Sequence, residues 1–362
     1  MQDWYSGTPP YETTILSGIR NAVKEGTEII HAEDNRMGQA EKAAAAADIA
    51  IVCVGNHPYG TRADWKFSPV PSDGREAVDR KSLMLPDEDL VKLVLKANPN
   101  TILVLVSSFP YTINWSQEHV PAIVHITHCS QEQGNGLADV LFGKVNPAGR
   151  TVQTWVKDII DLPDMMDYDI RNGRTYMYHQ GPVLYPFGYG LSYSDFTYEK
   201  IESVKQDKKN IRVTVSVKNT SGRDGEEVVQ LYVKDCTHSA IRPEKELKGF
   251  EKVFLNPGET KTVTMELDKR SFAWYNTELH DWFAASGEYK LLVGTSSRDI
   301  HLEGRIHLNS SQELPMHVHM NTTLGELFRN PKTSETAKEL TAKYISAMNV
   351  VRVLSEPLRA IT

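Results

Sequence analysis

The sequence predicts an α/β three-layer sandwich with a mostly parallel sheet, then an all-β sandwich and a short helical tail. Three observations predict this order. In the first 160 residues, segments rich in helix formers alternate with short apolar runs, which suit parallel strands buried on both faces. From Ile211 onward, apolar and polar residues alternate between turn clusters, as in antiparallel strands. Beyond residue 310, helix formers return.

The elements of the α/β region follow from local composition. Helices are predicted over 13–24 and 36–47, because both segments hold good helix formers and no proline. A third helix is predicted after Pro86, where acidic residues at 87–89 complement the helix dipole. The apolar runs that adjoin these helices are predicted strands, at 28–31, 49–55, 101–107 and 122–127.

The second half divides at its turn clusters. Alternating strands are predicted at 211–218, 228–233, 262–267 and 289–293, with Gly-, Asn- and Pro-rich turns between them. We therefore expect an α/β domain over 1–160, a connector over 161–194, a β-sandwich over 195–306 and a helical extension over 307–362. The extension is too short for a large core of its own, so we expect it to pack on something else.

Charge and hydropathy exclude two classes of partner. The 362 residues include 40 basic and 47 acidic side chains, a net charge of −7, which argues against a general affinity for nucleic acids. No apolar run approaches the roughly 18 residues that cross a bilayer, so no membrane partner is expected. The first ten residues show no export signal, which predicts a cytoplasmic protein if this amino terminus is the native one, and the location is otherwise open.

Cysteines and histidines predict neither disulfides nor a metal site. Cys53, Cys129 and Cys236 are widely spaced, and the first two adjoin apolar runs, so we expect both of these to be buried and inert. The histidine pairs at 125/128 and 317/319 lack cysteine or carboxylate partners at a familiar ligand spacing. No metal ligands are therefore predicted.

The stretch 56–80 is the best candidate for a functional loop. Loops this long are uncommon in compact domains, and a loop after a parallel strand lines the ligand crevice. Its aromatic side chains, which suit stacking on a sugar ring, are Tyr59, Trp65 and Phe67. Its charged side chains include Arg62, Arg75, Glu76, Asp79 and Arg80. From composition, a solvated charged loop remains an alternative to a sugar site in which Tyr59, Trp65 and Arg80 contact substrate.

Other catalytic motifs are absent or structural. The sequence holds no GxSxG elbow, and Gly134-Asn-Gly136 and Gly188-Tyr-Gly190 lack the continuation and the lysine of a phosphate loop. Ser194-Asp195-Phe196 leads into the first predicted sandwich strand, so it is not interpreted as a nucleophile motif.

An ordered set of segments resembles the second and third domains of glycoside hydrolase family 3, the β-glucosidases and β-xylosidases. The resemblance covers roughly residues 1–330. Its segments are Tyr5-Ser-Gly-Thr-Pro-Pro-Tyr11, Glu76-Ala-Val-Asp-Arg80, Leu83-Met-Leu-Pro86, Gln133 to Gly143, Val145-Asn-Pro-Ala-Gly-Arg150, Gly173 to Tyr178, Pro186 to Tyr193, Glu227-Val-Val-Gln-Leu-Tyr232 and Leu255-Asn-Pro-Gly-Glu259.

The resemblance implies an (α/β)₆ sandwich and a fibronectin type III-like domain, which in this family follow a (β/α)₈ barrel. It also implies a retaining glycosidase without cofactors, whose two carboxyl groups lie about 5–5.5 Å apart. The family's general acid/base stands three residues before the Asp-Arg pair and corresponds to Glu76, with Ala77 where glycine is usual. The family's nucleophile belongs to the barrel, so none is expected among these residues.

The resemblance leaves several interpretations open. One is the carboxyl-terminal part of a β-glycosidase that acts on a β-linked oligosaccharide or glycoside and is incomplete without a barrel domain, on the parent chain or a separate polypeptide. Another is a non-catalytic carbohydrate-binding or scaffolding module, and a third is a truncated product. The choice between glucose and xylose stays open, and a barrel-facing surface left exposed would favour a homo-oligomer.

Overall fold

The computed structural model describes residues 9–57, 74, 80–128, 131–206, 210–312, 314 and 318–348. The chain divides into two compact units. Unit 1 consists of Met1–Phe272 and Ser286–Asn309, and unit 2 consists of Ala273–Ala285 and Ser310–Thr362. Unit 1 therefore holds both the α/β region and the β-sandwich.

The α/β region is built on a parallel sheet with the order β1-β2-β3. Its strands are β1 (Ala50–Gly55), β2 (Thr101–Val106) and β3 (Ala122–Ile126). Val52 pairs with Leu103, which pairs with Ile123, so the three strands are in a single continuous register. Strands are thus confirmed within three of the predicted runs, those at 49–55, 101–107 and 122–127.

One face of this sheet carries the core of the region. Val52, Val54, Leu103 and Leu105 point to the same side and are buried. Helices pack over them: α2 (Gln39–Ala46), preceded by the 3₁₀ turn η1 (Arg36–Gly38), α3 (Glu88–Ala97) and α4 (Asn114–His119). The predicted helices at 36–47 and after Pro86 are confirmed.

The opposite face is covered less completely. Side chains alternate along a strand, so Cys53 lies on this opposite face. Cys53 is exposed, and the prediction that it is buried is therefore wrong. Protein atoms around its sulfur nevertheless raise the pKa of the Cys53 thiol to about 11, and it stays protonated at neutral pH. Cys129 lies outside the described residues.

The predicted strand at 28–31 does not form. The segment runs between α1 (Ile15–Ala22) and α2 without regular structure, and Ile30 is exposed. No described strand pairs with it, and a strand persists only where a neighbour accepts and donates its backbone hydrogen bonds.

Two glycines allow α1 and α5 (Gln133–Leu141) to cross closely. A Cβ atom on Gly18 would lie 2.1 Å from the backbone of Gly134, and one on Gly134 would lie 1.9 Å from the Thr14 carbonyl oxygen. The Gly134 N–H also donates to the Thr13 oxygen at 3.0 Å. The helix predicted at 13–24 is confirmed as α1.

A connector leads from the α/β region to the sandwich. It contains β4 (Trp155–Val156), the 3₁₀ turn η2 (Ile159–Asp161), α6 (Thr175–Tyr178) and β5 (Val183–Tyr185). β4 and β5 pair in antiparallel fashion, and Trp155 meets the edge of the His125 ring with centroids 5.0 Å apart. Trp155 belongs to the α/β core, and Leu184 and Tyr185 pack against it, so this strand pair extends that core.

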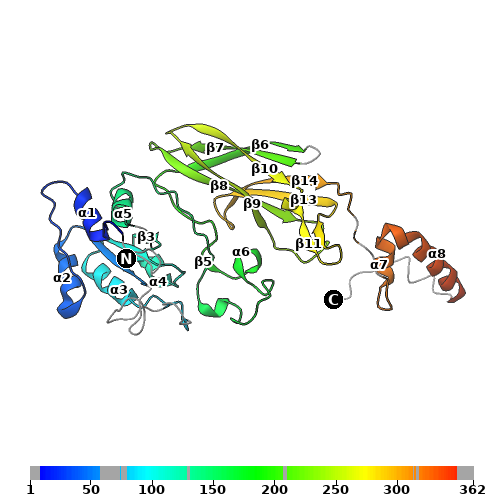
Figure 1. Cartoon of the computed structure of the whole chain (residues 1–362), viewed down its shortest axis with the longest axis horizontal. Helices are drawn as coiled ribbons and strands as arrows, with labels where there is room; N and C mark the ends of the chain where they lie inside the picture. The colour runs from blue at the N-terminus through cyan, green and yellow to red at the C-terminus, as the bar shows by residue number, and fades with distance from the viewer. Residues whose placement is uncertain are drawn as a thin grey trace. The chain divides into compact units, whose positions relative to one another are not determined.

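The sandwich consists of two antiparallel sheets, with the orders β10-β7-β6 and β14-β13-β8-β9 (Figure 1). Their strands are β6 (Phe196–Gln206), β7 (Asn210–Asn219), β8 (Gly225–Asp235), β9 (Glu246–Leu255), β10 (Thr260–Asp268), β13 (Gly287–Gly294) and β14 (Ile300–Leu308). Val213, Val215, Leu231 and Leu291 are fully buried between them. The fold class predicted from sequence is confirmed, including all four predicted strands.

Unit 2 contains a short hairpin and helices. The hairpin pairs β11 (Trp274–Asn276) with β12 (Asp281–Phe283), and the helices are α7 (Leu324–Arg329) and α8 (Pro331–Met348). Thr323 and Glu326 form a capping box at the start of α7. Among the described residues, no helix combines the length and apolar character needed to span a membrane.

Candidate functional site

Polar side chains gather where the three parallel strands end. Asn56 follows β1, Ser107 and Ser108 follow β2, and His128 follows β3 closely. Ser108 Oγ lies 2.8 Å from His128 Nδ1, and His128 Nε2 lies 2.7 Å from the Asn56 carbonyl oxygen. The Ser108 N–H donates to Asn56 Oδ1 at 3.2 Å. These contacts tie the carboxyl ends of all three strands together.

The partners of His128 fix the role of one ring nitrogen. A carbonyl oxygen only accepts hydrogen bonds, so Nε2 donates to Asn56, and Nδ1 shares the second hydrogen bond with the Ser108 hydroxyl. A serine beside an oriented imidazole is one element of nucleophilic catalysis. The Ser108 N–H, however, is already donated to Asn56 and does not stabilise an oxyanion. The cluster therefore fixes the edge of the sheet and presents one exposed hydroxyl, that of Ser108.

Arg80, a predicted substrate-binding residue, packs on aromatic rings beside this edge. Its guanidinium carbon lies 4.2 Å from the centroid of Phe109 and 4.6 Å from that of Tyr111. Its nitrogens donate to the carbonyl oxygens of Pro110, at 3.3 Å, and Met84, at 3.4 Å. Such cation–π and carbonyl contacts anchor the chain at Arg80 to the segment after β2.

Gly74 lies against the same ring. A Cβ atom at this position would approach both Arg80 Cδ and Phe109 Cζ to 2.7 Å, and the φ angle of +72° also favours glycine. Gly74 and Arg80 therefore meet on Phe109, although five residues separate them in the sequence.

The other predicted site residues lie outside the described part of the chain. Glu76, Tyr59 and Trp65 belong to this group, as does Asp79. The structure describes only Arg80 among the named site residues, and it places the guanidinium on aromatic rings and carbonyl oxygens. In the described part of the chain, no group of three or more His, Cys, Asp or Glu residues is arranged to hold a metal ion.

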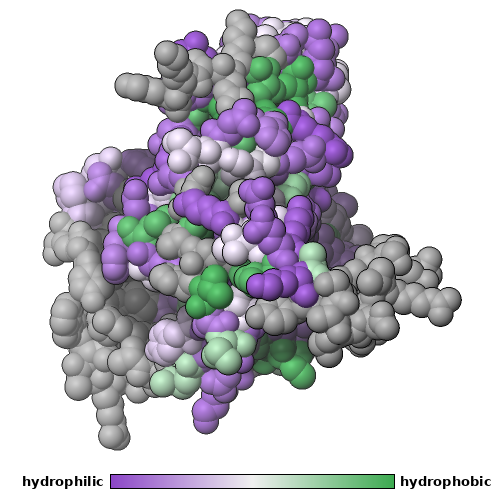
Figure 2. Space-filling model, turned by 90° about the vertical axis from the view of Figure 1, so that its right-hand side faces the viewer, coloured by the Kyte–Doolittle hydropathy of each residue, from purple (hydrophilic) through white to green (hydrophobic). Residues whose placement is uncertain are grey.

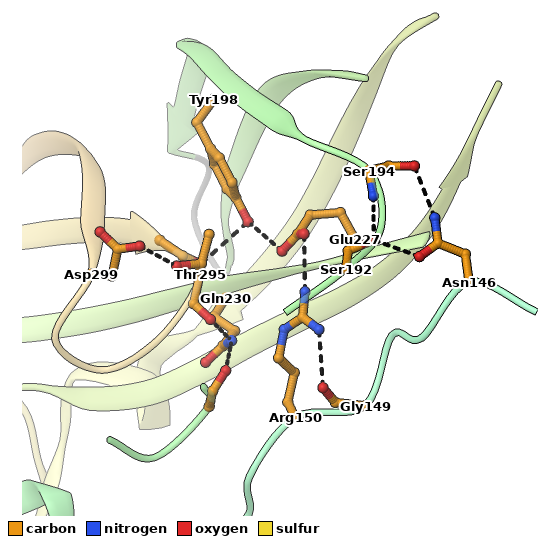
Figure 3. Close-up of polar contacts among 12 residues, drawn as sticks. Asn146, Gly149, Arg150, Ser192, Ser194, Tyr198, Glu227, Gln230, Thr295 and Asp299 are labelled. Carbon is orange, nitrogen blue, oxygen red and sulfur yellow. Dashed lines mark hydrogen bonds and ion pairs between the residues drawn. The ribbon is translucent and has the colours of Figure 1, made fainter. Parts of the chain in front are cut away.

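A buried ion pair joins the α/β region to the sandwich (Figure 3). Arg150 Nη2 lies 3.0 Å from Glu227 Oε2, and the two side chains are only 9% and 4% exposed. Tyr198 donates its hydroxyl to Glu227 Oε1 at 3.1 Å. Burial and the Glu227 charge raise the pKa of Tyr198, so the phenol remains a donor.

Neighbouring contacts extend this junction. Asn146 donates to Ser194 Oγ at 2.8 Å and to the Asp224 carbonyl oxygen, also at 2.8 Å. Gln230 donates to the carbonyl oxygens of Gly188 and Thr295 (Figure 3). Ser194 is buried in this network, in agreement with its interpretation as structural. The partners in these contacts are backbone carbonyl groups and side chains of the junction itself. The described contacts therefore hold the two regions together and assemble no reactive centre.

The sequence did not reveal the cluster of Asn56, Ser108 and His128. Each residue comes within two positions of the end of an apolar run, and the carboxyl ends of parallel strands meet at one edge. This position at the ends of apolar runs was the feature of the sequence that could have indicated the cluster. His128 was considered only as a metal ligand together with His125.

Comparison with known proteins assigns both regions of unit 1. The family model described as "Glycosyl hydrolase family 3 C-terminal domain" matches residues 1–193, and that of a fibronectin type III-like domain matches residues 227–297. The first match covers more than half of the chain.

Similar whole proteins and structures include β-glucosidases, and two similar proteins are exo-α-(1→6)-L-arabinopyranosidases of Bifidobacterium breve and Bifidobacterium longum, each 38% identical over 62% of this chain. The chain is 33% identical to thermostable β-glucosidase B of Acetivibrio thermocellus over 95% of its own length, and 38% identical to a β-glucosidase of Kluyveromyces marxianus over 74%. It spans 47% and 32% of the lengths of these two relatives. The crystal structure of a Bifidobacterium adolescentis β-glucosidase matches 91% of this chain with 30% identity and a TM-score of 0.74, and the chain covers 50% of it.

Proposed function

Since this chain belongs to glycoside hydrolase family 3, we propose that it supplies the general acid/base of a retaining β-glycosidase. The observation that supports this most directly is the family match over residues 1–193, a range that includes Glu76-Ala-Val-Asp-Arg80, the segment whose resemblance to the family implies the acid/base. The chain corresponds to the carboxyl-terminal portion of β-glucosidase-like family 3 enzymes. The nucleophile is assigned to the part of such enzymes that lies outside this match.

The proposed mechanism follows from two carboxyl groups. Protonated Glu76 donates its proton to the glycosidic oxygen while the nucleophilic carboxylate attacks the anomeric carbon, and the leaving group departs as an alcohol. The Glu76 carboxylate then removes a proton from water, whose oxygen attacks the anomeric carbon and displaces the nucleophilic carboxylate. This second step releases the sugar with retained configuration and restores protonated Glu76.

The described residue that precedes Glu76 supports a role for this segment at the edge of the parallel sheet. Glu76 follows Gly74 by two positions in the sequence. Gly74 contacts Phe109, three residues after the end of β2. This edge is where ligands bind in open α/β sheets.

Arg80 has a positioning role in this proposal. Its guanidinium is engaged by Phe109, Tyr111 and two carbonyl oxygens, so it anchors the chain at position 80, four residues after Glu76 in the sequence. Tyr59 and Trp65 remain the proposed stacking surfaces for the sugar. The proposed substrate is a terminal β-linked glucoside or xyloside, by analogy with the β-glucosidases that this chain resembles.

A chimeric enzyme tests the proposal. This chain replaces the matched 47% of the Acetivibrio β-glucosidase B, and hydrolysis of cellobiose and of 4-nitrophenyl β-glucoside is measured. We expect Glu76→Gln to lower kcat/KM for cellobiose by about 10²–10⁴-fold, the usual contribution of general acid catalysis. The loss on the nitrophenyl substrate should be smaller, because its leaving group needs little protonation.

The matched control is Asp64→Asn, which removes a carboxylate from the same loop and should retain activity. Equal losses on both substrates, or a larger effect of Asp64→Asn, would reject the acid role of Glu76. An inactive chimera that still binds cellobiose in calorimetric titration would favour the carbohydrate-binding module instead.

A further inference from the structure

Hydrophobic side chains reach the surface at several places, as the green areas of the face drawn in Figure 2 show. The connector segment 158–174 is unusual in this respect. Ile160, Met166 and Tyr168 are 84%, 73% and 81% exposed. We use the name apolar platform for all the exposed large apolar residues of this segment, which are Ile159, Ile160, Leu162, Met165, Met166, Tyr168 and Ile170.

The acidic side chains of the same segment are used on its own backbone and neighbours. Asp158 and Asp161 form a capping box around η2. Asp164 accepts from the Met166 N–H at 2.8 Å, and Asp167 accepts from the Asp169 N–H at 3.0 Å. Carboxylates at these positions stabilise consecutive turns. The polar groups therefore hold the backbone while the apolar side chains face outward, the reverse of an ordinary surface loop.

Arginine and tyrosine contacts hold the segment further. Arg174 donates to the carbonyl oxygens of Asp164, at 2.6 Å, and Asp167, at 2.7 Å. Tyr176 accepts from the Leu247 N–H of β9 at 3.0 Å and stacks on Phe187 with centroids 4.4 Å apart. The platform is thus pre-organised, and a partner that covers it pays little additional conformational entropy.

The net charge of segment 158–174 indicates which kind of partner the apolar platform can bind. Segment 158–174 holds five aspartates and two arginines, a formal charge of −5 + 2 = −3. Two copies of the platform placed face to face would bring these like charges together, which disfavours self-association. A partner of different sequence, with an apolar surface and basic residues around it, fits better.

We propose that the apolar platform is the docking surface for the portion of a family 3 enzyme that lies outside the matched region. This inference rests on the proposed function. The length of the relatives supports this proposal. This chain spans 47% of one relative and 32% of another, so more than half of each relative is available to cover the platform. The unbranched side chains of Met165 and Met166 adapt well to such an interface.

Methionine oxidation tests the proposal within one molecule. Met165 and Met166 belong to the platform, whereas Met37 and Met320 are exposed elsewhere and serve as internal controls. In this chain alone, we expect all four to be oxidised by hydrogen peroxide at similar rates and the chain to be a monomer by light scattering. In the chimera with Acetivibrio β-glucosidase B, oxidation of Met165 and Met166 should slow at least tenfold, and that of Met37 and Met320 should not.

A matched pair of variants gives an independent readout. Ile160→Asp and Ile241→Asp change similarly exposed isoleucines, 84% and 79%, so neither should alter the thermal unfolding of this chain alone. In the chimera, only Ile160→Asp should lower the Tm. Unchanged oxidation of Met165 and Met166 in the chimera, a chimera that fails to fold, or a dimer of this chain that Ile160→Asp abolishes would each overturn the proposal.

The test separates this inference from the function on which it rests. Protection of Met165 and Met166 without a dependence of hydrolysis on Glu76 would support docking and reject the acid/base assignment. Hydrolysis that depends on Glu76, with both methionines still reactive, would reject docking and retain that assignment.

Discussion

The β-sandwich and the parallel α/β sheet belong to the same unit but differ in how they bury their strands. In the sandwich, Val213, Val215, Leu231 and Leu291 have no exposed surface, because two sheets close on each other. In the α/β region, one face of the sheet is covered by helices, whereas Cys53 on the other face is exposed.

The sandwich therefore contributes mainly stability, whereas the α/β region carries the groups that we propose to act in function. The two sheets of the sandwich bury each other's apolar side chains, and this closed core makes the sandwich a rigid support for the elements that contact it. The α/β region and its connector instead present the polar strand ends, the segment that leads to Glu76 and the apolar platform. The groups that we propose to serve a ligand or partner belong to the less enclosed region, since a closed core has no room for them.

The largest expected effect comes from breaking the junction of the two regions. Arg150→Ala leaves the Glu227 carboxylate buried without its cation, and we expect the free energy of unfolding to fall by about 3–5 kcal/mol. Urea unfolding followed by circular dichroism measures the loss. Arg212→Ala removes the exposed ion pair with Glu266 and should cost less than about 1 kcal/mol. Similar losses for both variants would show that the buried pair is not the main link.

A cavity in the sandwich is the next largest change. Leu231 is fully buried, so Leu231→Ala should lower the free energy of unfolding by about 2–5 kcal/mol. Leu191, which is 72% exposed, provides the control, and Leu191→Ala should stay within about 0.5 kcal/mol. A small loss at Leu231 would mean that the sandwich core relaxes to fill the space.

The helix crossing of the α/β region tests its tighter packing. Gly134→Ala places a methyl group against the Thr14 carbonyl oxygen, and we expect a loss of about 1–3 kcal/mol in the free energy of unfolding. Gly136→Ala, on the same helix but facing open space, should instead stabilise by about 0.5–1 kcal/mol. Thermal unfolding of the two variants should therefore shift in opposite directions.

The smallest effect is a pH dependence that arises in the α/β region. Burial lowers the pKa of His125, whose ring lies nearly perpendicular to that of Trp155, so the unfolded chain takes up this proton at a higher pH than the folded chain. The stabilisation is complete above the unfolded value of about 6.5 and is lost as the pH falls below it. His125→Gln should weaken the decline in the free energy of unfolding between pH 7.5 and 5.5. The same decline in both proteins would contradict this origin.

Local patterns account for the elements that were predicted correctly. The strands at 49–55 and 101–107 and the alternating strands of the sandwich follow from side-chain periodicity, which reflects burial on one or two faces. The run at 28–31 has a similar composition yet forms no strand, because pairing depends on a neighbour that composition does not supply. Cys53 shows the same dependence, since its exposure is set by what covers the sheet.

The residues of the candidate site also fall into a group that the sequence indicated and a group that it did not. The family resemblance led to Glu76 and to its segment, because a sequence motif is local. The contacts among Asn56, Ser108 and His128 join residues 52 and 20 positions apart, and Arg150 meets Glu227 across 77 positions. No periodicity connects residues at such separations.

Residue order alone determined that this chain makes a helix-and-strand layer followed by an antiparallel sandwich, and that it shares the segments of family 3 enzymes. Hydrophobic spacing and turn residues act over a few positions, so they can be recognised without coordinates. Only the tertiary structure decided which strand ends meet, where Arg80 and Gly74 join on Phe109, and that the connector turns its apolar side chains outward. Those features depend on contacts between distant residues, which exist only after the chain has folded.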